Sequence, residues 1–185
     1  AIILGDEDLL PAVLSSIPDD LKYLNVTMGL AFRLTQVYSF IDGVLKMQQN
    51  FNRRRTNKKF YFRDILSVLN HQYLITIYGK ETQALITQIH KENKIYIEPD
   101  SFSDDKVLSS IIKKVESPEQ MLVYLRNLLE SLLEQISMDS IDLKLEKEYI
   151  YLLKTRLIKI SNLFIDQQIV GSLDSFIRIF RKILS

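Results

Sequence analysis

Residues 117–136 read SPEQMLVYLRNLLESLLEQI, and this stretch decides the fold class. Ser117 is a favourable N-cap, Pro118 suits the first helical position, and Gln120 is placed to close a capping box. The spacing predicts a helix to about Ile136 with a wide apolar stripe, which must be buried against neighbouring helices. The stripe consists of Leu122, Leu125, Leu129, Leu132, Leu133 and Ile136.

The same helical spacing continues on both sides of this segment. Downstream, we expect a longer helix from about Ile141 to Ile169 and a last one from Ser172 to Leu184, after a C-cap glycine at Gly171. Upstream, apolar residues between Phe60 and Leu69 share one helical face, and a second amphipathic stretch follows from about Lys80 to Lys91. A short extended piece is expected at Lys94 to Glu98. Residues 51–185 are therefore predicted to form an all-helical bundle.

The first fifty residues show a different pattern, which predicts the elements strand, helix, strand and helix in this order. The predicted elements are Ile2 to Leu4, about Glu7 to Ile17, Tyr23 to Thr27 and about Thr35 to Gln49. Two short strands cannot form a stable parallel sheet covered on both faces, so this lobe should be completed by other strands. We therefore predict a mainly α fold, with a small partial α/β lobe at 1–50, and we expect the chain to be a piece of a longer protein.

The composition limits the classes of function that the sequence allows. The formal net charge is only +1, from 24 basic and 23 acidic residues, so any contact with nucleic acid must be local. The absence of cysteine removes thiol chemistry and favours a cytoplasmic compartment. Apolar runs are interrupted by charges well short of a membrane span, and the N-terminal residues do not form a signal peptide pattern.

No catalytic, metal or cofactor site is predicted. The five glycines form no phosphate-binding loop, and His71 and His90 stand far apart without metal-ligand spacing, which favours ordinary surface or helix-end roles. Pro99-Asp100 and Glu92-Asn93-Lys94 resemble parts of a paired-carboxylate nuclease site. Their order is reversed and the Glu-x-Lys falls at a helix end, so we interpret them as a chance match.

A basic run at the predicted lobe boundary allows two interpretations. Arg53, Arg54, Arg55, Lys58 and Lys59 lie close in sequence to the aromatic residues Phe51, Phe60, Tyr61 and Phe62. Cations beside aromatic rings suit a contact with single-stranded nucleic acid. Charge runs at boundaries are also common in solvated linkers, which is the slightly favoured alternative.

Four segments of the opening lobe form a recognisable series: AIIL at 1–4, DEDLLP at 6–11, SIP at 16–18 and LNVTMG at 24–29. With them, this lobe resembles the second RecA-like domain of UvrD-type superfamily I helicases, and most closely the ATPase-dead subunits of AddB type. Further similarity lies at Arg33, Thr35 and Val37, and at 64–66 and 69–71, so that the resemblance covers roughly the first 75 residues.

The resemblance implies a parent protein that pairs with an active helicase-nuclease subunit and processes DNA double-strand ends for recombination, with a nuclease domain of the PD-(D/E)xK type outside this segment. Residues 1–50 would then be part of the 2A lobe, and 51–185 a helical 2B-like insertion. The segment itself would be a non-catalytic scaffold that contacts DNA or the partner subunit. Its phosphate-contact candidates are Thr27, Arg33, Arg53, Arg54, Arg55, Lys58 and Lys59.

A stand-alone helical adaptor is the alternative. Such a protein would bind its partner through an apolar stripe such as Leu125, Leu129 and Leu132. It explains the bundle and the near-zero charge, but it leaves the strands of the opening lobe without sheet partners. Apolar faces on an excised lobe would also allow the isolated piece to form a homodimer.

Overall fold

The computed structural model describes residues 9, 12–13, 16–17, 32–54, 58–99, 106–136, 144–166 and 171–184. Within these residues the fold is mainly α, as predicted. The strands predicted at 2–4 and 23–27 lie outside the described residues, as does nearly all of the helix predicted at 7–17. The elements are η2 (Phe32–Leu34), α2 (Gln36–Arg53), β1 (Phe60–Tyr61), α3 (Phe62–Leu69), α4 (Gln72–Glu92), β2 (Tyr96–Ile97), α5 (Lys106–Ile111), α6 (Pro118–Gln135), α7 (Lys144–Asp166) and α8 (Leu173–Leu184).

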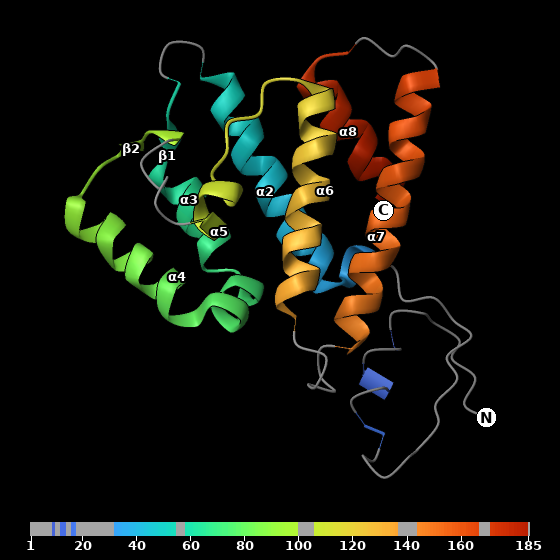
Figure 1. Cartoon of the computed structure of the whole chain (residues 1–185), viewed down its shortest axis with the longest axis horizontal. Coiled ribbons are helices and arrows are strands. Elements are labelled where there is room, and N and C mark those ends of the chain that lie inside the picture. Colours follow the sequence, from blue (N-terminus) through green and yellow to red (C-terminus); the bar gives the residue numbers. More distant parts are fainter. Residues whose placement is uncertain are drawn as a thin grey trace.

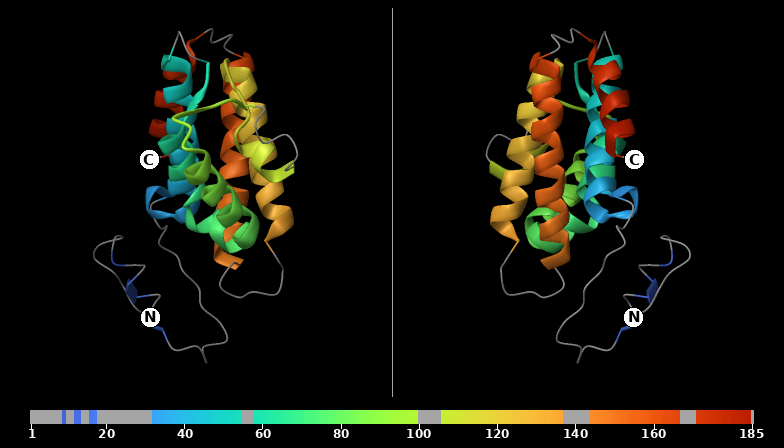
Figure 2. Two further views of the ribbon diagram at one scale, coloured as in Figure 1. Left: turned by 90° about the vertical axis from the view of Figure 1, so that its left-hand side faces the viewer. Right: turned by 90° about the vertical axis from the view of Figure 1, so that its right-hand side faces the viewer.

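Four of the helices form a bundle in two layers. Helix α2 contacts α7 and α8, and α6 contacts α7 and α8. Figure 2 shows α6 and α7 as one layer beside the layer that holds α2 and α8. The interior between the layers is aliphatic and aromatic, because each helix turns one apolar stripe inward. Residues from all four helices are almost fully buried there, among them Phe40, Val44, Leu125, Leu129, Leu153, Ile160, Phe176 and Phe180.

A second group of elements packs on the other side of α2 (Figure 1). Helix α3 contacts both α2 and α4, and strands β1 and β2 form an antiparallel pair in which Tyr61 stands opposite Tyr96. The rings of Phe51 and Phe60 stack at 4.4 Å between α2 and β1, inside the core. The extended piece predicted at 94–98 is therefore confirmed as β2, and its partner strand is the residue pair directly before α3.

Local capping explains where the bundle helices begin. The Thr35 hydroxyl accepts from the backbone N–H of Tyr38 at the start of α2. Ser117 accepts from the N–H of Gln120, and the Gln120 side chain accepts from the N–H of Glu116, one residue before the cap. Both bonds satisfy amides that have no partner within the helix. The start predicted at Ser117-Pro118 is thus confirmed, as is the last helix after Gly171.

Helix α4 differs from its prediction in length. It begins at Gln72 and not near Lys80, with a kink at Gly79, where the backbone is not helical. The added segment, QYLITIYG, is rich in β-branched and aromatic residues that have modest helix propensity. Burial of Tyr73, Leu74 and Tyr78 stabilises it as a helix in spite of that propensity. The short helix α5 was not predicted.

Helix α2 crosses the predicted lobe boundary at residue 50 and ends at Arg53. Its buried residues belong to the same hydrophobic cluster as those of α3, α6 and α8. The division of the chain into a lobe at 1–50 and a bundle at 51–185 stays a prediction. Among the described helices, none has both the length and the apolar character that a membrane span requires.

Candidate functional site

The two histidines, for which the sequence favoured ordinary surface or helix-end roles, lie at the start and on the surface of α4. His71 caps α4, with its Nδ1 atom accepting from the N–H of Tyr73 at 3.3 Å. Its ring lies against those of Phe40 and Tyr73, and burial lowers the pKa of His71. His90 is exposed on α4. In the described part of the chain, no three His, Asp or Glu side chains are grouped so that they could hold a metal ion.

The Glu92-Asn93-Lys94 sequence forms the end of helix α4. Asn93 adopts the left-handed conformation, with φ 48°, that commonly terminates a helix. Glu92 forms an ion pair with Lys94 at 2.9 Å, and hydrogen bonds from Lys94 and Gln88 hold the pKa of its carboxyl below the usual range. Asp100 lies outside the described residues. Two of the three nuclease-like side chains therefore pair with each other at a helix end.

The phosphate-contact candidates do not form one surface. Thr27 and Arg55 lie outside the described residues. Arg33 is in η2 at one end of α2 and Arg53 is at the other, and the 18 residues of α2 span about 27 Å at a helical rise of ~1.5 Å per residue. Of the candidates that the structure describes, Arg53, Arg54, Lys58 and Lys59 lie at the same end of α2, and Arg33 lies at the other.

Each of these four basic residues already has a carboxylate partner. Arg53 approaches its partner at 3.6 Å, Arg54 at 3.1 Å and Lys59 at 2.7 Å, and Lys58 is also in direct contact with a carboxylate. Neutralised cations attract phosphate less strongly than free ones do. Arg53 pairs with Asp174, Arg54 with Asp64, Lys58 with Glu116 and Lys59 with Glu98.

Two tyrosines nevertheless gather around Arg54, and we call this group the Arg54 cluster. The Arg54 guanidinium lies 5.0 Å from the centroid of the Tyr61 ring and 6.0 Å from that of Tyr96, which is 43% exposed. Sequence reasoning missed Tyr96, because only the pairing of β1 with β2 brings it beside Tyr61. Phe51 and Phe60, which were part of the aromatic signal, are instead buried in the core.

A separate apolar surface lies on α6 and α7. Val123 and Ile158 are 49% and 50% exposed, although both are large aliphatic residues. They border a hollow of about 210 Å³ between the two helices, which we call the α6–α7 groove. It is lined by Leu122, Val123, Arg126, Lys154, Leu157, Ile158, Ser161 and Asn162.

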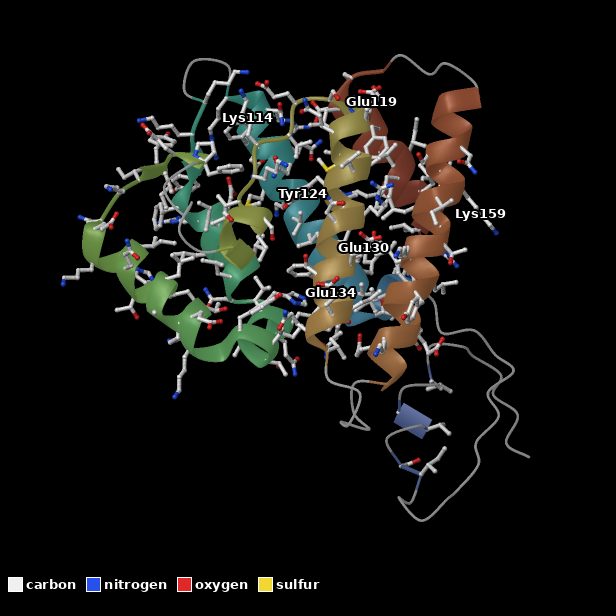
Figure 3. All side chains as sticks on the ribbon, viewed as in Figure 1. Lys114, Glu119, Tyr124, Glu130, Glu134 and Lys159 are labelled. Carbon is white, nitrogen blue, oxygen red and sulfur yellow. The ribbon has the colours of Figure 1, made fainter. Side chains whose placement is uncertain are left out.

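The charges in this groove are of one sign. Arg126 and Lys154 line it, and none of its lining residues is acidic. Glu130 forms an ion pair with Lys154 at 2.8 Å, and the pKa of its carboxyl is held below the usual range by the hydrogen bond from Lys154 and by the charges of Lys154 and Arg126. Figure 3 shows Lys159 on the outer side of α7, away from α6. The groove is therefore aliphatic, with a cationic wall formed by Arg126, which has no ion pair within 4.0 Å among the described residues, and by Lys154, whose charge Glu130 partly neutralises.

The stripe proposed for an adaptor is not available to a partner. Leu125, Leu129 and Leu132 are at most 1% exposed and lie inside the bundle. Helix α6 is apolar on several sides, and it turns those three leucines toward the other bundle helices. The apolar residues of α6 that line the groove are Leu122, which the predicted stripe includes, and Val123, which it does not.

A larger hollow of about 950 Å³ lies between α6 and the segment that includes Ser109 to Val115. Tyr124 borders it, is buried, and donates a hydrogen bond to the Ile111 carbonyl at 2.5 Å. Burial raises the pKa of Tyr124 well above its usual value. Lys114 at the rim pairs with Glu116 at 3.1 Å. Tyr124 and Lys114 thus have structural partners at this hollow.

Comparisons with protein-family models, with curated proteins and with solved structures found no match to this chain.

Proposed function

We propose that this chain is a non-catalytic helical scaffold that binds a protein partner through the α6–α7 groove. The observation that carries the proposal is the exposure of Val123 and Ile158 on either side of an aliphatic hollow. Neighbouring apolar residues of the same helices, such as Leu125 and Leu157, are buried. Paired exposed aliphatic residues beside a groove are typical of surfaces that receive an apolar side chain from a partner.

The structural roles of the polar side chains described above support a binding role over a catalytic one. His71 serves as a helix cap, Tyr124 as a buried hydrogen-bond donor, and the basic residues near β1 as members of ion pairs. A catalytic site needs a nucleophile, an acid or base and a stabilising group within reach of one reacting atom. The described side chains show no such convergence.

The resemblance of the opening residues suggests what larger assembly the scaffold would serve. In an AddB-type subunit, a helical insertion of this kind would contact the active helicase-nuclease partner or the DNA. We propose that the bundle has this scaffold role, with the α6–α7 groove facing a protein.

A selection experiment tests the protein-binding role. The full chain is used to select binders from a display library of helical peptides, and each binder is then measured on the double variant Val123→Glu/Ile158→Glu. We expect binding to weaken at least about tenfold, because two carboxylates enter an apolar contact. The matched control is Ile75→Glu, which alters an isoleucine of similar exposure on α4. Failure to select any binder, or binders indifferent to the double variant, would count against the role.

Single-stranded nucleic acid is the second candidate ligand, and the Arg54 cluster is the observation that favours it. Tyr96 presents an exposed ring beside Tyr61 and a guanidinium, a combination on which a base can stack. We expect labelled single-stranded DNA to bind weakly at low salt and to lose about fivefold or more in affinity on Tyr96→Ala. Ile95→Ala, at the exposed neighbouring residue, is the control. Equal affinities of the two variants would exclude stacking at this site.

A further inference from the structure

We propose that the occupant of the α6–α7 groove is an amphipathic helix whose apolar residues are flanked by carboxylates. The inference rests on the protein-binding role proposed above and specifies the partner's chemistry. It is carried by the combination of an aliphatic hollow, a cationic wall and a strip of exposed apolar residues that follows α7.

The shape of the surface favours a helical partner. Tyr151 and Ile158 are both 50% exposed, and their separation of seven residues places them on the same face of α7, two turns apart. Val123 stands across the hollow from Ile158 on the adjacent helix. A helix docking along this strip would contact it through apolar residues spaced three, four and seven apart, as in other helix-in-groove contacts.

The basic residues of the groove favour a partner with acidic residues beside its apolar stripe. Lys154 lies between Tyr151 and Ile158 in sequence and lines the hollow, and Arg126 lines it from α6. Lys154 pairs with Glu130, whereas Arg126 acts on that carboxylate only through its charge and forms no ion pair within 4.0 Å among the described residues. The guanidinium of Arg126 is therefore the group best placed to pair with a carboxylate from outside. A partner with glutamate or aspartate beside its apolar stripe would complete this pairing, whereas lysine there would be repelled.

The same charges disfavour a second copy of this chain as the occupant. In a two-fold contact each copy presents the same surface to the other. Two copies joined through the α6–α7 groove would place Arg126 and Lys154 near their own counterparts, and Glu130, which pairs with Lys154, would offset only part of this positive charge. The groove therefore fits a different chain of complementary charge better than it fits itself.

Two synthetic peptides test the inference on the full chain. Both are 18-residue helices with identical leucine positions, one with glutamate beside the leucines and the other with lysine, and binding is followed by fluorescence anisotropy. We expect the acidic peptide to bind about tenfold more tightly than the basic one, because each exposed ion pair adds a modest factor. We also expect its affinity to fall with added salt.

Variants locate the contact. Arg126→Glu combined with Lys154→Gln is expected to weaken the acidic peptide about tenfold and to strengthen the basic one. Lys46→Glu, at an exposed lysine in the middle of α2, is the matched control and should leave both affinities unchanged. Circular dichroism confirms that each variant remains helical.

The outcomes separate this inference from the proposed function. If both peptides bind equally well and both lose affinity on Val123→Glu/Ile158→Glu, the protein-binding role stands and the acidic partner is excluded. If the acidic peptide binds but is indifferent to the groove variants, it binds elsewhere and the inference is overturned. If neither peptide binds while library binders do, the partner has another shape and the inference is again overturned.

Discussion

Leu157 and Ile158 are adjacent aliphatic residues of the same size, and the structure predicts opposite responses to truncation. Leu157 is 4% exposed and Ile158 is 50% exposed. Replacement by alanine removes three carbon atoms from either residue, each worth about 0.8 kcal/mol when fully buried. For Leu157→Ala the transfer loss and the remaining cavity together should cost about 2–5 kcal/mol.

For Ile158→Ala, the loss of transfer free energy is about half as large, because about half of the side chain is already exposed to water. The higher helix propensity of alanine offsets part of the remainder, so the expected cost is below about 1 kcal/mol. Urea denaturation followed by circular dichroism at 222 nm gives both free energies of unfolding, with unchanged m-values as the check on two-state behaviour. Equal losses, or a larger loss at Ile158, would refute the assignment of Ile158 to the surface.

Three further predictions concern single contacts. Ser117→Ala removes the side-chain acceptor at the start of α6 and should lower the free energy of unfolding by about 1 kcal/mol in urea titrations. Burial lowers the folded-state pKa of His71, so the unfolded chain binds the proton more readily, and the free energy of unfolding should fall as the pH drops below about 6.5. His71→Asn keeps a cap for the N–H of Tyr73 and should reduce this pH dependence of the melting temperature in thermal scans. Arg181→Ala breaks a half-exposed ion pair with Asp42 between α8 and α2 and should cost less than about 1 kcal/mol, with a smaller effect in high salt.

The extent of α6 could be predicted because its signals are local. Ser117 and Pro118 mark the start within two residues, and the leucine spacing carries the helix to Ile136. The predicted stripe is largely confirmed, since Leu125, Leu129, Leu132 and Ile136 are buried, Leu122 and Leu133 are partly buried, and the exposed Val123 lies outside it. The spacing did not show that the buried face extends to Met121, Tyr124 and Leu128, which depends on packing against neighbouring elements.

The site residues depend on contacts between distant parts of the sequence. The basic run is visible in the sequence, but the carboxylates that neutralise it come from α3, α8, the segment before α6 and the end of β2. Tyr96 joins Tyr61 only through strand pairing. The α6–α7 groove is likewise formed by residues of two helices that lie side by side. Neither the position of Val123 nor that of Ile158 in the sequence indicates the groove by itself.

The exposed isoleucines provide the most direct test of binding at the α6–α7 groove, because they belong to several different elements of the fold and only Ile158 lines the groove. The measurement is the chemical-shift change of isoleucine methyl groups when a selected helical peptide is added to the full chain. We predict that the Ile158 signal moves while those of the other exposed isoleucines stay in place. Movement of those signals with Ile158 unchanged would contradict the account. The other reporters are Ile75 on α4, Ile95 beside β2, and Ile179 and Ile183 on α8.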